Sequence, residues 1–438
     1  MEQTTPVKNR LYRTIWRWHF YAGLFCIPFI LTLAVSGSIY LFKPQIDNWI
    51  DKPYSQLDTT GTRSTPQQQI NAALATLPNS TFASYRLPKN NQEAVVVTLK
   101  HQAEQVLVYV HPYTLEVLKQ VGYNDQFIRV VRTFHGELLM GKVGSVLVEL
   151  AGCWAIVMII TGLYLWWPRN ASGLAGVVYP RLKTGGRQFW RDLHAVTGFW
   201  VSLFTLFLLI SGLPWALVWG SAFKEVRSLA KPAIQQNWSI SSADELHNHG
   251  NENTAHNLIL TQSLLEKGQV LNFAHPVEFA PARNKPHQWQ LSSQHQNRPL
   301  RSNAWFDAKT ESLIDLKHFS DKSTVDKVVG IGIAAHEGHL FGWFNQFLSL
   351  LTTLGLVLVS VSGFILWRKR KPNGALGAPA VQANAAVTKT VWGITILLAL
   401  FLPLLAVSLI SLTILELCLF RYIPSLRKWL GLRQEPAG

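Results

Sequence analysis

Four histidines stand at the ends of long apolar segments, two in each half of the chain. His19 and His194 each precede a Ser-Gly pair by 17 and 18 residues. His135 and His336 each precede a Thr-Gly or Ser-Gly pair by 26 and 27 residues. Two neutral imidazoles on facing helices suit axial ligation of a haem iron, with the porphyrin in an apolar slot between the helices. The spacing predicts two haem sites: His19 with His194, and His135 with His336.

Other readings of these histidines stay open. A lone histidine at a span end is commonly an interfacial or packing residue, and an imidazole pair also suits copper or zinc, although no Cys or Met cluster accompanies it. His339 follows His336 by three residues on the same helix face and is an alternative or additional outer ligand. Gly23 and Gly198, each four residues after a histidine, would leave room for a flat ring.

Charged residues near the histidines are candidates for supporting roles. Arg17, Arg132 and Arg191 are candidate partners for haem propionates. Glu137 and Glu337 could orient an imidazole, or they could be solvated acids near a positive helix end. Glu149 is an intramembrane carboxylate, which marks it either as a functional candidate or as a group reaching the outer water.

Composition places these histidines in a membrane protein. The chain has 438 residues, 48% of them hydrophobic and only 15% charged, below the usual quarter for a soluble protein. Several apolar segments exceed the roughly 20 residues that a helix needs to cross the hydrocarbon core. The net charge of +15 comes from basic residues beside these segments, so anionic lipid and topology explain it better than nucleic acid does.

The positive-inside rule gives an orientation with a cytoplasmic amino terminus and two long periplasmic connections. Basic tail residues argue against a fifth crossing, and a hairpin kinked at Pro403 would return the tail to the inside. The predicted segments are a cytoplasmic N-terminus 1–17; spans 18–43, 135–167, 191–222 and 336–367; periplasmic domains 44–134 and 223–335; cytoplasmic loops 168–190 and 368–390; a fifth span or kinked hairpin 391–420; and a tail 421–438.

The predicted fold is an α-helical membrane bundle of two direct repeats, each with one small α+β periplasmic domain. In the first connection "INAALATLP" predicts a helix, and "EAVVVTLK" and "QVLVYVHPYTLEVLKQV" predict alternating strands. In the second, "LILTQSLLEKG" predicts a helix, and "HQWQLSS" and "SNAWFDAKTESLIDL" predict strands. "VHPYTLEVL" and "FDAKTESLI" occupy matching places in the two connections.

These features resemble the PepSY-associated transmembrane helix family. The resemblance is carried by "WRWHFYAGLF…SGSIYLF", "FHGELLMGKVG…TGLYLWWPR", "FWRDLHAVTGFW…SGLPW" and "HEGHLFGWFNQ…SGFILWRKRK", with "VYVHPYTLEVL" resembling the PepSY module. It implies a bacterial inner-membrane protein with two non-covalent b-type haems between four helices, at His19, His194, His135 and His336. It further implies an oxidoreductase that reduces ferric iron in siderophores and releases the iron in the periplasm.

The sequence leaves the electron donor open, because no flavin or nicotinamide domain like that fused to some relatives is present; quinol or a cytoplasmic reductase could serve. The alternatives are a non-enzymatic envelope regulator, which restrains a peptidase or senses a ligand, and an iron-related permease. The predicted histidine layers lie roughly 30 Å or more apart along the helices, a long gap for electron transfer between two haems.

Overall fold

The computed structural model describes residues 7–169, 172–230, 258–283, 285, 287–379 and 387–432. Those parts of the predicted segments 1–17, 168–190, 223–335, 368–390 and 421–438 that fall in the gaps lie outside the described residues. The chain divides into two compact units. A helical unit comprises residues 1–38, 134–234 and 348–438, and a sheet unit comprises residues 39–133 and 235–347.

Within the described part of the chain, five helical segments are long and apolar enough to cross a membrane. Helices are the natural solution there, because lipid offers no partner to a free backbone N–H or C=O group. The chain is therefore a membrane protein. The segments are Arg10–Leu41, Gly141–Trp166, Gly186–Trp215, Trp343–Arg370 and Pro403–Tyr422.

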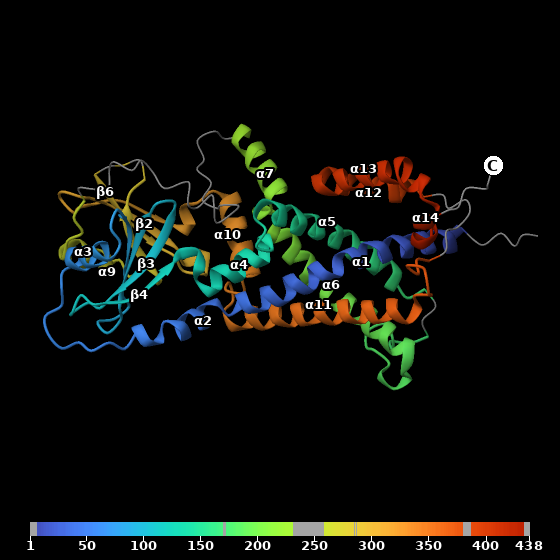
Figure 1. Ribbon diagram of the computed structural model, residues 1–438, viewed down its shortest axis with the longest axis horizontal. Coiled ribbons are helices and arrows are strands. Elements are labelled where there is room, and N and C mark those ends of the chain that lie inside the picture. The colour runs from blue at the N-terminus through green and yellow to red at the C-terminus, as the bar shows by residue number, and fades with distance from the viewer. Residues whose placement is uncertain are drawn as a thin grey trace, which may run out of the picture. The chain divides into compact units, whose positions relative to one another are not determined.

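Four long helices supply the first four of these segments (Figure 1). Shorter helices flank them. The long helices are α1 (Val7–Leu41), α5 (Gly141–Trp166), α6 (Gly186–Gly212) and α11 (Trp343–Arg370), and the shorter ones are α2 (Lys43–Ile50), α4 (Phe127–Glu137), α7 (Leu217–Ala230) and α10 (Thr324–His336).

The second and fourth spanning helices begin later than the sequence predicts, at Gly141 and Trp343. Spans 135–167 and 336–367 were expected to start at their histidines, but His135 lies near the end of α4 and His336 ends α10. The backbone turns after each of these helices, with positive φ at Leu138 and Leu139 in one case and at Gly338 in the other. Each histidine therefore stands before the turn that leads into a spanning helix.

The last apolar segment is broken into α12 (Lys389–Phe401) and α13 (Pro403–Cys418), which pack against each other. Pro403 cannot donate a backbone hydrogen bond, so the helix ends before it. Helix α12 is about 20 Å long, too short to cross the hydrocarbon core. The next helix, α14 (Pro424–Leu430), returns to the first turns of α1, where Arg17 donates to Gly431 O at 2.7 Å. This is the arrangement of a kinked hairpin.

The sheet unit contains one antiparallel sheet of eight strands in the order β4-β3-β2-β1-β5-β6-β7-β8. Helices α3 (Pro66–Thr76) and α9 (Gln262–Val270) pack on the same core as strands of both halves, around Trp289 and Phe279. The strands are β1 (Thr81–Leu87), β2 (Val95–His101), β3 (Glu104–Val110), β4 (Val117–Gly122), β5 (Val277–Pro281), β6 (Gln288–Ser293), β7 (Ser302–Asp307) and β8 (Leu313–His318).

The two predicted α+β domains are thus two halves of one sheet. Strand β1 pairs with β5, placing Tyr85 opposite Phe279 and Leu87 opposite Val277. Between them, Arg86 forms an ion pair with Glu278 at 3.1 Å. This pairing satisfies two strand edges that separate domains would leave open to water or to other chains.

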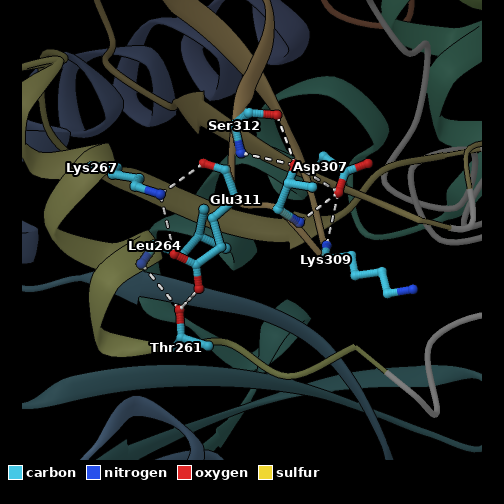
Figure 2. Close-up of polar contacts among 8 residues, drawn as sticks. Thr261, Leu264, Lys267, Asp307, Lys309, Glu311 and Ser312 are labelled. Carbon is cyan, nitrogen blue, oxygen red and sulfur yellow. Dashed lines mark hydrogen bonds and ion pairs between the residues drawn. The ribbon is translucent and has the colours of Figure 1, made fainter.

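A polar network ties the second half together where the β7–β8 turn meets α9 (Figure 2). The Thr261 side chain caps α9 by accepting from Leu264 N at 3.1 Å, and its hydroxyl donates to the Glu311 carboxylate. Lys267 donates to the same carboxylate at 3.3 Å. In the turn itself, Asp307 Oδ1 accepts from the backbone of Lys309 at 2.9 Å. These contacts fix the turn and α9 with respect to each other.

Candidate haem site of the helical unit

His19 and His194 face each other inside the helical unit. His19 lies on α1 and His194 on α6, and their ring centroids are 6.4 Å apart with 81° between the ring planes. Two imidazole nitrogens, each about 2 Å from one metal ion between them, put the ring centroids about 6 Å apart. The separation therefore matches that of two axial ligands of one metal ion.

Hydrogen bonds fix which nitrogen of each ring is available. Val359 O can only accept, so the His194 Nδ1 atom 2.9 Å away must carry the proton. The Thr161 hydroxyl donates to Val157 O at 2.8 Å, so it accepts from His19 Nδ1 at 3.0 Å. Within the described part of the chain, neither Nε2 atom has a hydrogen-bond partner. Both Nε2 lone pairs are therefore free to bind a metal, with a polar partner orienting each ring.

His135 is held in the same way, against α1. The Ser36 hydroxyl donates to Thr32 O at 2.7 Å and lies 2.9 Å from His135 Nδ1, from which it accepts. The His135 Nε2 atom is again left without a hydrogen-bond partner among the described residues. Because 17 residues separate His19 from Ser36 on α1, the two histidine levels lie about 25 Å apart along that helix.

A glycine lies under each of these three rings. A Cβ atom built on Gly162, Gly37 or Gly363 would come within 3.2 Å of the Cε1 atom of His19, His135 or His194, respectively. Only glycine gives the imidazole full room at such contacts. These Ser-Gly and Thr-Gly pairs mark the repeat in the sequence, but their contact with the imidazole rings was not predicted. Their constant spacing from the histidines was the signal that could have revealed it.

The predicted clearance glycines lie in looser surroundings. A Cβ on Gly23 would meet Met158 Cε at 3.8 Å, and one on Gly198 would meet Val359 Cγ2 at 4.0 Å, both ordinary contact distances. Neither glycine is required by the packing described. An alanine would therefore fit at either position, and the role of both glycines in clearing a ring stays a prediction.

The predicted propionate partners have protein partners of their own. Arg17 donates to Pro379 O and Gly431 O, both at 2.7 Å, and Arg191 pairs with Asp192 at 3.0 Å. Arg132 belongs to the sheet unit. A fourth arginine was not among the predictions: Arg370, on α11, lies over the rings of Trp16 and Phe20, the latter adjacent to His19.

Glu149 has a structural partner. It is 6% exposed, and its two carboxylate oxygens accept from the backbone N–H groups of Val218 and Trp219 at 2.7 and 3.0 Å. These are N–H groups of the first turn of α7, which no backbone carbonyl of the helix can satisfy. Glu149 therefore caps α7 from α5, and does not reach the histidine pair through these bonds.

Of the remaining predicted residues, His336, Glu337 and His339 lie in the sheet unit, and Glu137 lies in the helical unit. His336 ends α10, and its pairing with His135 stays a prediction. Glu337 is buried, and its Oε2 atom has no hydrogen-bond partner in the described part of the chain. The same holds for His339 Nε2, and burial, with Lys43 and His295 nearby, lowers the pKa of His339 to about 4. Glu137 ends α4, where its backbone carbonyl accepts from Met140 N at 2.8 Å.

The described residues contain no group of three or more His, Cys, Asp or Glu side chains that could hold a bare metal ion. A haem needs only two protein ligands, because the porphyrin supplies four nitrogens. The His19–His194 pair has the ring separation and the two unengaged Nε2 atoms that a metal ion bound by two imidazoles would need. The residues present fit a haem better than a bare ion.

Comparison with known proteins supports the family resemblance. A search of curated proteins finds no match. The PepSY-associated TM region, in contrast, matches residues 16–370, which include all four histidines and the whole sheet. Because the match covers well over half of the sequence, the chain belongs to the family defined by the PepSY-associated TM region.

Proposed function

We propose that this protein is a transmembrane oxidoreductase of the bacterial inner membrane that holds two haem b groups and reduces ferric iron on the periplasmic side. His19 and His194 would bind one haem, and His135 and His336 the other. The observation that carries the proposal is the His19–His194 pair, with 6.4 Å between ring centroids and both Nδ1 atoms engaged.

Haem supplies a one-electron carrier held within the membrane. The residues around it set the conditions for that chemistry. Thr161 and Val359 keep the proton of each imidazole on Nδ1, so that Nε2 stays a lone-pair donor. Gly162 and Gly363 let the rings lie against α5 and α11.

The direction of transfer follows from the orientation that the basic clusters of the sequence predict, with the amino terminus in the cytoplasm. The His19–His194 pair would then lie near the cytoplasmic face and accept electrons from quinol or a cytoplasmic reductase. One electron converts ferric iron, held by hard oxygen ligands in a siderophore, to ferrous iron, which those ligands bind less strongly. Iron release follows from that loss of affinity.

The deciding experiment is the visible spectrum of the full-length protein, expressed with added haem precursor and purified in detergent. The expected result is a Soret band with the α and β bands of bis-histidine haem b after reduction. His19→Ala and His194→Ala should each remove the same part of the signal, and His287→Ala, at an exposed position in the sheet unit, should remove none.

A colourless protein under these conditions would overturn the proposal. It would favour a regulator or binding protein of the cell envelope, for which the sheet unit is sufficient and no haem is needed. Unequal loss in His19→Ala and His194→Ala, with one variant keeping its full spectrum, would show that these two residues do not share one haem.

A further inference from the structure

A cationic pocket lies in the sheet unit between the second half of the sheet and α10. Its volume is about 230 Å³, and its charged walls come from the turn before β7, from β8 and from the segment before α10. We call it the β7–α10 pocket. Its lining includes Arg298, Arg301, Trp305, Lys317 and Lys322.

The charges of this pocket are unbalanced. Four Lys and Arg side chains line it, against the carboxylates of Asp321 and Asp326. Lys322 is half-buried, and burial followed by the charges of Arg298 and Arg301 lowers its pKa. Its ammonium group has no hydrogen bond or ion pair with the described residues. A bound anion would relieve this crowding of like charges.

Several walls of the pocket are held in place. Arg301 Nε donates to the carbonyl of His295 at 2.6 Å, which fixes the direction of its guanidinium. Lys317 lies 5.5 Å from the centre of the Trp305 ring and 3.4 Å from Asp315. Charges that are positioned before binding lose less entropy when an anion arrives. The pocket is thus arranged for oxygen anions.

The pocket is continuous with the helix that carries a predicted haem ligand. Gly330 and Ile333 of α10 line it. Gly330 lies six residues before His336 on the same helix, which is about 9 Å along its axis. A group bound in the pocket would therefore lie close to the end of α10, where His336 stands.

We propose that the β7–α10 pocket binds the anionic carboxylate oxygens of a soluble ferric chelate, and so selects polyanionic chelates as substrates. This proposal rests on the proposed function, which names iron as the metal. The positive charge of the pocket is the reason for proposing an anionic ligand. The cavity is smaller than the roughly 300–1,000 Å³ of most small-molecule sites. It therefore suits a small chelate or one acidic arm of a larger one.

Gallium(III) citrate is the probe, because Ga³⁺ copies the size and charge of Fe³⁺ but is not reduced, so binding is measured without haem turnover. Calorimetry uses the full-length protein in phosphatidylcholine nanodiscs. Lys322→Gln and the more exposed Lys317→Gln should each weaken binding about tenfold or more through one lost charge-assisted contact. Lys309→Gln, in the β7–β8 turn outside the pocket lining (Figure 2), should leave binding unchanged.

Two results would overturn the inference. One is absence of gallium citrate binding, or equal binding by wild type, Lys322→Gln and Lys317→Gln. The other is loss of gallium citrate binding by the wild type in nanodiscs that contain phosphatidylglycerol, because the pocket would then hold a lipid headgroup. If the protein contains haem and reduces ferric iron but fails this test, only the inference about the pocket is wrong. If a colourless protein binds gallium citrate, only the proposed function is wrong.

Discussion

The imidazoles of His19 and His194 meet edge to face, with 6.4 Å between their centroids, although 175 residues separate them along the chain. Each ring uses Nδ1 for a partner on another helix, Thr161 Oγ1 or Val359 O. Four helices therefore contribute to one pair of rings. Such an arrangement orients each ring through its Nδ1 atom and leaves both Nε2 atoms available for one metal ion.

Thr161→Val should change haem binding without changing the fold. Valine has nearly the same shape but cannot accept the Nδ1 proton of His19, so the ring loses this hydrogen bond and is held less firmly. We expect haem affinity to fall by about 10- to 100-fold, the usual cost of removing such a partner. The measurement is haem titration of the apoprotein followed at the Soret band.

The matched control is Thr352→Val on α11. Thr352 is buried, and its hydroxyl donates to the carbonyl four residues earlier, as that of Thr161 does, but no histidine accompanies it. Equal loss of haem affinity in the two variants would mean that the threonine hydroxyl acts on helix packing and not on His19.

Gly162→Ala should displace the His19 ring. The added Cβ would lie 3.2 Å from Cε1, so the imidazole must move by a few tenths of an ångström. We expect weaker haem binding and a shifted low-spin spectrum, while the span stays inserted because alanine is the better helix former. Gly152→Ala on the same helix, whose Cβ would meet Leu209 at 3.8 Å, should leave the spectrum as it is.

Gly23→Leu should exclude the porphyrin. The packing described leaves an ordinary 3.8 Å contact with Met158 at this position, so Gly23→Ala should be accepted and a leucine side chain should fill the space that the ring needs. We expect normal amounts of membrane-inserted protein with strongly reduced Soret absorbance per protein for Gly23→Leu. Full haem content in that variant would show that the ring does not approach this face of α1.

The sequence was sufficient to predict that His19 and His194 lie close together, because their matching places in two similar segments can be read along the chain. It could not show which nitrogen stays free, since that depends on partners such as Val359 O, 165 residues from His194. The capping role of Glu149 could not be predicted for the same reason, because the N–H groups that it caps are 69 and 70 residues away along the chain.

In the sheet, too, the sequence predicts some elements and not others. Strands β2, β3, β4, β6, β7 and β8 follow alternating or apolar patterns and were predicted, but β1 and β5 were not. In β1, Arg86 interrupts the apolar residues, and its partner Glu278 lies 192 residues further along the chain. These two segments are therefore strands because they pair with each other across a long stretch of chain, which local sequence does not reveal. The same pairing joins the two expected domains into one sheet.

Glu149→Ala should destabilise the helical unit and leave the proposed haem in place. The substitution leaves the Val218 and Trp219 N–H groups without their acceptors in a buried position, at a cost of about 1–3 kcal/mol for each buried group. We expect a lower thermal unfolding temperature in detergent and an unchanged visible spectrum at low temperature. A variant of normal stability that had lost haem or electron transfer would instead assign Glu149 to the redox chemistry.

Acid should loosen the β7–β8 turn and α9 before the rest of the sheet. The Thr261 hydroxyl, then that of Ser263, holds the pKa of Glu311 below its usual range, and the Thr310 and Lys309 N–H groups do the same for the pKa of Asp307. A lowered folded-state pKa stabilises the fold above the unfolded-state values of about 4. This stability is lost as the pH falls from about 4 through the folded-state pKa values.

Hydrogen exchange followed by mass spectrometry can test this locally. Labelling at neutral pH and at stepped pH values down to about 3, corrected for the intrinsic pH dependence of exchange, should show protection of α9 and the turn constant from neutral pH to about 5 and falling below about 4. Glu311→Gln should reduce this pH dependence, because an amide does not titrate, and Glu266→Gln on the exposed face of α9 should keep it. Identical pH profiles for wild type and Glu311→Gln would contradict the assignment and would place the acid-sensitive group elsewhere in the sheet unit.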